Sequence, residues 1–341
     1  MTGAVGQMLI FGLAVAGGLF LVGFAGFILR SGLQEYGLHR IPCLLYHQFQ
    51  PSRDTRRLHD VDPVYVCFAD QFALQMNHLN EAGYVTLTLD ELVAARRDPA
   101  LLPPKPVLIT IDDGFGSTYE LAFPILRRNA QKATLFMTPD RESENFKAFS
   151  HLDRPLTDGE LREMAASGID IQSHGLSHRF LTELDGAELQ RELTEPRHII
   201  EQVTGRKVDY LAIPGGAYNR RVRQAVQRAG YRAAFCMRKG SALPTTDLFY
   251  LPRMVVSRDM TLEDFRALLS PAGCLRGRLI SAFQEGISRM LGMRRTDAFR
   301  NWLYASPLAP LLQPRRLVWL LLTVVLTGLA AAVAFLTRYL F

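Results

Sequence analysis

The chain has 341 residues, a formal net charge of +6 and four cysteines, and is long enough for one large domain or two small ones. The cysteines form no CxxC pair and match neither a zinc site nor a disulfide framework. The basic residues are not interleaved with aromatic residues as in nucleic-acid-binding proteins, so we expect no nucleic-acid partner.

Uncharged apolar runs lie near both ends, at Met8–Leu29 and Leu317–Leu336, and each is long enough to span a bilayer as a helix. No Lys or Arg precedes the first run, which favours a retained anchor over a cleaved signal peptide. We therefore predict an N-terminal transmembrane anchor over residues 1–33 and a C-terminal transmembrane helix over residues 315–341, both in a bacterial inner membrane. Flanking arginines favour a cytoplasmic domain, but long domains also translocate regardless of charge, so the side of the membrane stays open.

Between these runs, apolar segments rich in β-formers alternate with helical patterns. The strand candidates are Pro42–Tyr46, Tyr84–Thr88, Val107–Ile111, Ala133–Met137, Ile169–Ser173, Asp209–Ile213, Arg232–Cys236 and Pro252–Val256. Pro196 interrupts the helical pattern from Asp185 to Gly205, and we expect a kink or a break there. Strands that alternate with helices predict an α/β fold with a mostly parallel sheet or barrel, whose active site gathers at the C-terminal ends of the strands.

The segment 271–314 combines an apolar helical face with many arginines. This pattern predicts a basic amphipathic, membrane-proximal segment that contacts lipid. An ordinary surface helix packed on the barrel explains the same pattern equally well.

The first chemical feature is the end of the strand candidate Val107–Ile111, which runs directly into Asp112, Asp113 and Gly114. Adjacent carboxylates at a strand end can point in different directions, so that one can hold a metal while the other acts as a base. An ordinary Asp-Gly turn after a strand would have the same sequence.

The second feature follows the strand candidate Ile169–Ser173, where His174 and His178 are separated by three residues. In a compact turn both imidazoles can face one point, although surface or capping histidines would explain the pair as well. Two imidazoles and a carboxylate with open positions are typical of a catalytic metal site. These ligands suit zinc, with cobalt, nickel, manganese and iron as alternatives.

These two features resemble the first two motifs of the polysaccharide deacetylase family (the NodB-homology domain, or carbohydrate esterase family 4). The motifs are Thr110-Ile-Asp-Asp-Gly114 and Ser173-His-Gly-Leu-Ser-His178. Further similar segments are Leu44-Leu-Tyr-His47, Lys132-Ala-Thr-Leu-Phe136, Ala212-Ile-Pro-Gly-Gly-Ala-Tyr-Asn219 and Leu251-Pro-Arg253. The resemblance covers Ile41 to Leu269, which gives a deacetylase domain over residues 34–270, and it implies a distorted (β/α)7-type barrel.

The resemblance also implies roles for individual residues. Asp113, His174 and His178 would bind the divalent metal, and Asp112 would be the general base. The backbone N–H of Gly215 would help to hold the oxyanion of the tetrahedral intermediate.

Three positions depart from the family pattern, and one of them is Gly215, which stands where members have an aromatic residue before the glycine of the third motif. Ala212 stands where many members have an arginine that orients the base, and the late histidine of many members is replaced in Leu251-Pro-Arg253. The pattern is closest to the poly-N-acetylglucosamine deacetylase branch, which implies His47 as the general acid; a structural strand-end histidine is the alternative. Arg253 is either a partner of the catalytic carboxylates or a salt bridge beneath the barrel.

Three functional hypotheses follow from the sequence. The first is a metal-dependent hydrolase that removes N-acetyl groups from N-acetylhexosamine units of a glycan at the membrane. The second is a deacylase of a lipid-linked sugar on the cytoplasmic face. The third is a catalytically silent scaffold subunit of a membrane glycan assembly. We also expect partners in a polysaccharide synthesis or export assembly.

Overall fold

The computed structural model describes residues 23, 26–37, 39–51, 58 and 61–291. The chain divides into two compact units, one over Gly37–Cys274 and the other made of Met1–Tyr36 together with Leu275–Phe341. All the candidate site residues lie in the first unit. The limits predicted above for the four segments of the chain remain predictions.

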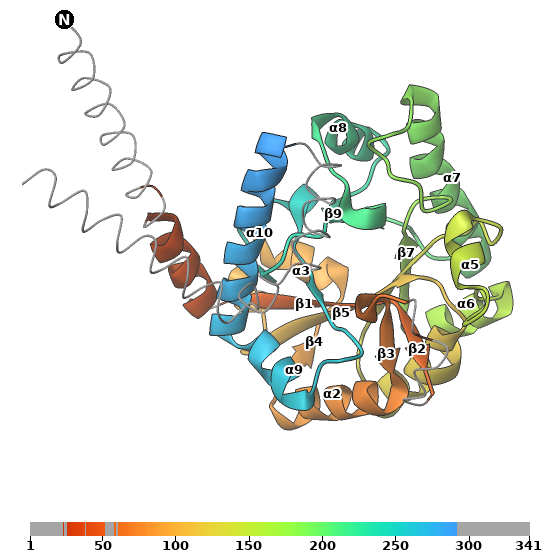
Figure 1. Cartoon of the computed structure of the whole chain (residues 1–341). Helices are drawn as coiled ribbons and strands as arrows, with labels where there is room; N and C mark the ends of the chain where they lie inside the picture. The colour runs from red at the N-terminus through yellow and green to blue at the C-terminus, as the bar shows by residue number, and fades with distance from the viewer. Residues whose placement is uncertain (1–22, 24–25, 38, 52–57, 59–60, 292–341) are drawn as a thin grey trace, which may run out of the picture. The chain divides into compact units, whose positions relative to one another are not determined.

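The first unit is built on strands that surround its centre, with helices α2, α6, α7 and α8 outside them (Figure 1). The strands are β1 Ile41–Tyr46, β2 Gln48–Gln50, β3 Val66–Phe68, β4 Val85–Thr86, β5 Pro106–Asp113, β6 Thr134–Met137, β7 Asp170–Ser173, β8 Tyr210–Ala212, β9 Ala233–Phe235, β10 Ser241–Ala242 and β11 Met254–Val255.

Helices connect most of these strands. They are α2 Ala69–Glu81, α3 Leu89–Ala95, α4 Phe123–Arg128, α5 Glu144–Phe149, α6 Asp158–Ala166, α7 Gly186–Thr204, α8 Arg220–Arg228, α9 Leu262–Leu269 and α10 Pro271–Leu291, with short helical turns η2 Pro63–Tyr65, η3 Pro99–Leu101, η4 Thr118–Ala122, η5 Pro214–Gly216 and η6 Leu248–Tyr250.

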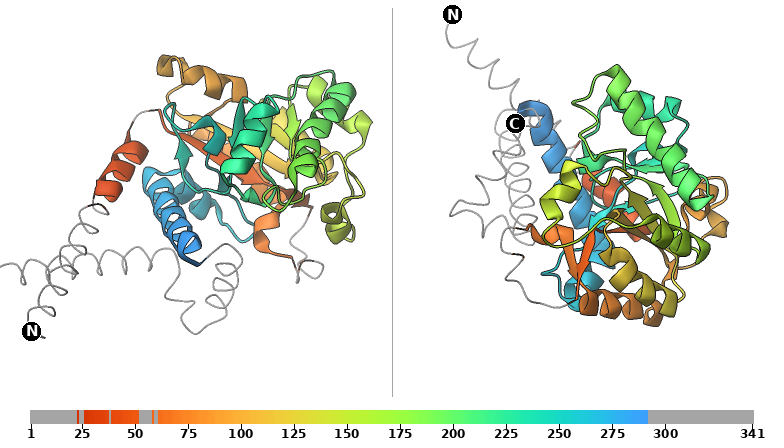
Figure 2. Two further views of the ribbon diagram at one scale, coloured as in Figure 1. Left: turned by 90° about the horizontal axis from the view of Figure 1, so that it is seen from above. Right: turned by 90° about the vertical axis from the view of Figure 1, so that its right-hand side faces the viewer.

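The main sheet runs in the order β10-β1-β5-β6-β7-β8-β9, and β11 pairs with β1. All its pairings are parallel except that of β1 with β10. A bridge between Phe235 and Leu251 brings β9 towards the segment that leads into β11, so the sheet curls back on itself; two further views of the curled sheet are given in Figure 2. The predicted α/β class with a parallel, curled sheet is therefore confirmed.

The curl has two apolar sides because successive residues of a strand point to opposite faces. On β5, Ile109 and Ile111 belong to the large core cluster that also contains side chains of the surrounding helices. Leu108 belongs to a smaller cluster with Phe136 and Phe235, from β6 and β9. Strand β5 is buried along its whole length, which fixes where its last two residues emerge.

Helix α7 is not broken at Pro196, where a kink or a break was predicted. It begins after the N-cap Asp185 and ends at Gly205 as the sequence indicated, but it continues through Pro196 without a break. Pro196 is buried in this helix, together with Leu193 and Ile200. Packing of this face against the core holds the helix together despite the backbone hydrogen bond that a proline cannot donate.

The predicted localisation in a bacterial inner membrane, with two transmembrane helices, is corrected by the structure. Within the described ranges, no helix is both long enough and apolar enough to cross a bilayer. The helix over residues 26–36 carries Arg30 and Glu35, and a span needs about 20 predominantly apolar residues. The run Leu317–Leu336 and most of Met8–Leu29 lie outside the described residues.

The described part of the second unit contains a buried ion pair. Glu35 Oε1 lies 2.5 Å from Arg278 Nη2 and also accepts a hydrogen bond from Nε of the same arginine at 2.9 Å. This pair ties the helix before the first unit to the helix after it. The predicted contact of segment 271–314 with lipid remains a prediction.

Candidate active site

The candidate site begins where β5 ends. Asp112 has the same side-chain direction as Leu108 and therefore projects inside the curl. Asp113 would point to the opposite face, but its backbone is left-handed, with a φ of 76°. This conformation is strained for an aspartate and turns the side chain away from the strand direction. The two adjacent carboxylates thus face the same site.

His174 and His178 follow β7, which is separated from β5 by one strand. Asp113 Oδ1 lies 3.5 Å from His174 Nε2 and 3.4 Å from His178 Nε2. One ligand atom from each of Asp113, His174 and His178 lies within 4.8 Å of the others. His178, like Asp113, has a left-handed backbone, with a φ of 63°.

The tautomer of His174 is set by its surroundings. Its Nδ1 lies 2.8 Å from the carbonyl oxygen of Ala212, and a carbonyl can only accept, so Nδ1 carries the proton. Nε2 then carries no proton, and its lone pair is directed at the cluster, as in many metal-binding histidines. Ala212, where many family members have an arginine, therefore serves the site through its backbone.

The residues present fit a divalent cation. Asp113 Oδ1 is buried, and no hydrogen-bond donor among the described residues reaches it, although it faces two imidazole nitrogens. Burial lowers the pKa of His174 to about 3 and also lowers that of His178, so both rings are neutral ligands at pH 7. Burial, reinforced by Asp112, raises the pKa of Asp113 to about 6. A cation in the cluster would satisfy the orphaned oxygen and favour the ionised carboxylate.

Asp112 has a different partner. Arg253, which is only 1 % exposed, donates from Nη1 to Asp112 Oδ1 at 2.6 Å. Burial alone would raise the pKa of Asp112, but the Arg253 guanidinium, together with His174 and His47, holds this pKa below its ordinary value. Asp112 is therefore ionised at neutral pH. Of the two alternatives given by the sequence for Arg253, the structure selects the partner of the carboxylates.

His47 directly follows β1, which is the neighbour of β5 in the sheet. Its ring is buried and packs edge-on against Tyr65, with 5.1 Å between the ring centroids. Burial lowers the pKa of His47, while the charges of Asp113 and Asp112 oppose this shift. Nδ1 of His47 is buried, and no described group forms a hydrogen bond with it.

Gly215 lies on the turn η5 after β8 and is exposed, with a φ of 59°. A Cβ atom on Gly215 would lie 2.3 Å from Cε1 of Phe180, so glycine is required beneath this ring. A Cβ atom on Gly216 would lie 2.2 Å from Cγ of Met237. Phe180 is 51 % exposed and Met237 is 41 % exposed. The turn that carries Gly215 is therefore bordered by apolar side chains that face solvent.

Two residues near the cluster were not found from the sequence. Asn145 on α5 lies beside Asp113 and lowers its pKa, in opposition to burial. Glu192 on α7 accepts hydrogen bonds from the turn between the two histidines. Neither residue belongs to a sequence motif. Each reaches the site because the fold places its helix there.

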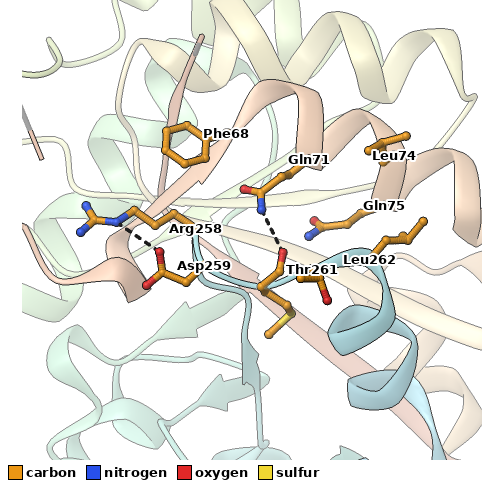
Figure 3. Close-up of a pocket in the computed structure, with 9 residues that line it drawn as sticks. Phe68, Gln71, Leu74, Gln75, Arg258, Asp259, Thr261 and Leu262 are labelled. Carbon is orange, nitrogen blue, oxygen red and sulfur yellow. Dashed lines mark hydrogen bonds and ion pairs between the residues drawn. The ribbon is translucent and has the colours of Figure 1, made fainter. Parts of the chain in front are cut away.

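A pocket of about 410 Å³ is lined by none of the candidate site residues. Figure 3 shows it between α2 and the segment that leads into α9, where Gln71 donates to the carbonyl of Met260 and Arg258 pairs with Asp259. Its lining residues are Phe68, Gln71, Leu74, Gln75, Arg258, Asp259, Met260, Thr261 and Leu262.

Comparison with known families matches residues 101–234 to the polysaccharide deacetylase model. The matched residues include Asp112, Asp113, His174, His178 and Gly215. The chain contains a polysaccharide deacetylase domain. This deacetylase is thus a hydrolase that acts on the amide bonds of N-acetyl groups.

Relatives of the deacetylase include YxkH of Bacillus subtilis strain 168, which is itself assigned to the polysaccharide deacetylases. The two are 28 % identical over 230 residues, which cover 67 % of this chain and 76 % of YxkH. A poly-β-1,6-N-acetyl-D-glucosamine N-deacetylase of Staphylococcus aureus strain N315 is 24 % identical over 204 residues, which cover 57 % of this chain and 69 % of the relative.

Solved structures share the fold. The Streptococcus pyogenes deacetylase PplD, in complex with acetate, has a TM-score of 0.61 at 23 % identity, over 69 % of this chain and all of PplD. IcaB from Ammonifex degensii has a TM-score of 0.57 at 22 % identity, over 69 % of this chain and 97 % of IcaB.

Proposed function

We propose that the deacetylase removes N-acetyl groups from N-acetylhexosamine units of a glycan, with a divalent metal, zinc, held by Asp113, His174 and His178. The observation that carries this proposal is that the ligand atoms of the three side chains lie close together. One of them, Asp113 Oδ1, is buried and receives no hydrogen bond from the described residues. A divalent ion held there supplies Lewis-acid polarisation of the acetamido carbonyl.

In this proposal the other residues move protons and hold charge. Asp112, kept ionised by Arg253, takes a proton from the water that attacks the acetyl carbonyl carbon. The Gly215 N–H donates to the oxygen that becomes negatively charged. His47 gives a proton to the departing amine nitrogen. Its neutral ring must first gain that proton, and the two neighbouring carboxylates favour the charged form.

A glycan chain rather than a small amide is supported by the surface around Gly215. Phe180 and Met237 expose large apolar areas beside the turn, and Tyr65 exposes part of its ring beside His47. Exposed apolar side chains grouped at a site are typical of a binding surface. The pyranose ring has an apolar face that can stack on such side chains. The sequence similarity to a poly-β-1,6-N-acetyl-D-glucosamine N-deacetylase agrees with this substrate class.

The test is acetate release from N-acetylglucosamine oligomers, β-1,4- and β-1,6-linked, by the full-length protein after chelation and after reloading with one equivalent of zinc. We expect release from oligomers by the reloaded protein, little from the free monosaccharide, and none after chelation. Zinc-loaded protein that releases no acetate from either oligomer would contradict the proposal. That outcome would instead favour the silent scaffold.

The assignment of His47 as the acid predicts that His47→Ala lowers kcat by about 10²–10⁴-fold. Zinc affinity should stay unchanged because His47 is not among the three converging ligands. His151→Ala, at an exposed histidine, is the matched control and should retain full activity. Near-normal turnover of His47→Ala at pH 7 would leave His47 with only a structural role.

A further inference from the structure

The turn that joins the two candidate histidine ligands is held by one side chain from another element. Glu192 lies on α7, and its carboxylate is directed at residues 176 and 177 between His174 and His178. Oε2 of Glu192 accepts from Leu176 N at 2.9 Å and from Ser177 N at 3.1 Å. Oε1 accepts from the hydroxyl of Ser177. Three donors of this short turn therefore converge on a single carboxylate.

This carboxylate is buried, with only 4 % of Glu192 exposed. Within the part of the chain that the structure describes, no Lys or Arg forms an ion pair with it. A buried carboxylate without a cationic partner is costly unless hydrogen bonds satisfy it, and here the donors come from the histidine turn. Removal of the carboxylate would in turn leave two backbone N–H groups of the turn without their acceptor.

The backbone of the turn needs this support. Gly175 and His178 both have left-handed backbones, with φ values of 77° and 63°. A Cβ atom on Gly175 would lie 3.2 Å from Glu192 Oε2 and 3.2 Å from Cγ of Pro214, so the turn is pressed closely against the carboxylate. A strained residue such as His178 persists only where its surroundings hold it in place.

We propose that Glu192 is a positioning residue that fixes the turn between His174 and His178, and thereby sets the affinity of the site for its metal. The proposal rests on the function given above, in which both histidines are ligands. Its basis is that Glu192 forms hydrogen bonds with two of the three residues between the ligands and occupies the space that a Cβ atom on the third, Gly175, would need. It makes no hydrogen bond to either histidine.

The test compares zinc binding to the metal-free full chain by competition with a chromophoric chelator. Glu192→Ala should weaken zinc binding by about 10–100-fold, as is usual when support beyond the ligands is lost. Glu192→Gln keeps an oxygen that can accept both N–H groups, so it should restore most of the lost affinity. Ser177→Ala removes one hydrogen bond alone and should have a smaller effect in the same direction.

Glu201→Ala is the matched control. Glu201 lies on the same helix and also accepts a backbone hydrogen bond, from Val208 N at 3.0 Å, but this bond is not at the site. Its substitution should leave zinc affinity unchanged. At saturating zinc, Glu192→Ala should regain most of its deacetylase activity, which a global loss of structure would not allow.

Wild-type affinity in both Glu192→Ala and Ser177→Ala would overturn the positioning role, and the proposed function would stand. If Glu192→Ala does not fold, Ser177→Ala still decides, because wild-type affinity in that variant then overturns the positioning role. A wild-type chain that binds no divalent ion would instead contradict the metal site itself.

Discussion

The Asp112→Asn variant is expected to lose about 10²–10⁴-fold in kcat/KM for deacetylation, the usual contribution of a general base. Asparagine has nearly the same shape as aspartate but cannot accept the proton of the attacking water. Zinc affinity should be nearly unchanged because Asp112 is not one of the three groups whose ligand atoms converge. The measurement is acetate release at saturating zinc, together with chelator competition to confirm metal occupancy.

The control for this experiment is Asp170→Asn. Asp170 is a carboxylate at the start of β7, the end of the strand opposite His174, and burial raises its pKa to about 6. Its replacement removes a partly buried negative charge without reaching the site, so activity should remain close to wild type. Equal activity of wild type and Asp112→Asn with confirmed zinc would remove Asp112 from the mechanism.

The second large effect is expected at Arg253. In Arg253→Met the buried Asp112 loses its guanidinium partner, and burial then raises the Asp112 pKa against only the weaker opposition of His174 and His47. Asp112 must be ionised to act as a base. When its pKa rises, it becomes protonated at low pH, and activity there is lost first. We expect the acidic limb of the kcat/KM profile to move upward by more than about one pH unit. Activity at alkaline pH should be partly retained.

Arg253→Lys separates the charge from the geometry of this pair. A lysine keeps the positive charge but cannot reproduce the planar guanidinium, which lies 5.8 Å from the ring of Phe136 and 5.9 Å from that of Phe235. The acidic limb of Arg253→Lys should lie between those of the wild type and Arg253→Met. A uniform loss of activity in both variants with an unshifted acidic limb would mean that Arg253 acts only on packing.

Asp112, Asp113, His174 and His178 could be singled out from the sequence because each pair follows an apolar strand. In a parallel sheet, such strand ends lie at the same edge. The α/β class followed from the same alternation of strands and helices. These inferences needed only local patterns and one rule of topology.

The remaining features depend on contacts that no local pattern encodes. Arg253 meets Asp112 across 141 residues of sequence, through the curl that brings β11 beside β1. Glu192 is one of four glutamates of α7, and it is distinguished by its burial and by the turn that lies opposite it. Pro196 was expected to kink or break its helix, but the packing of α7 keeps the helix unbroken. Apolar length alone also led to the predicted membrane localisation, which is corrected because no helix within the described residues could cross a bilayer.

The curl of the sheet has one further consequence. Strand β11 is only two residues long and is paired with β1 at Leu44–Met254 and Leu45–Val255. Arg253 immediately precedes this short ladder, whereas the metal-ligand candidates follow the longer strands β5 and β7. Local opening of the ladder would withdraw the guanidinium from Asp112 while the three ligand groups stay in place. The partner of the base and the metal-ligand candidates are thus held by different strands of the sheet.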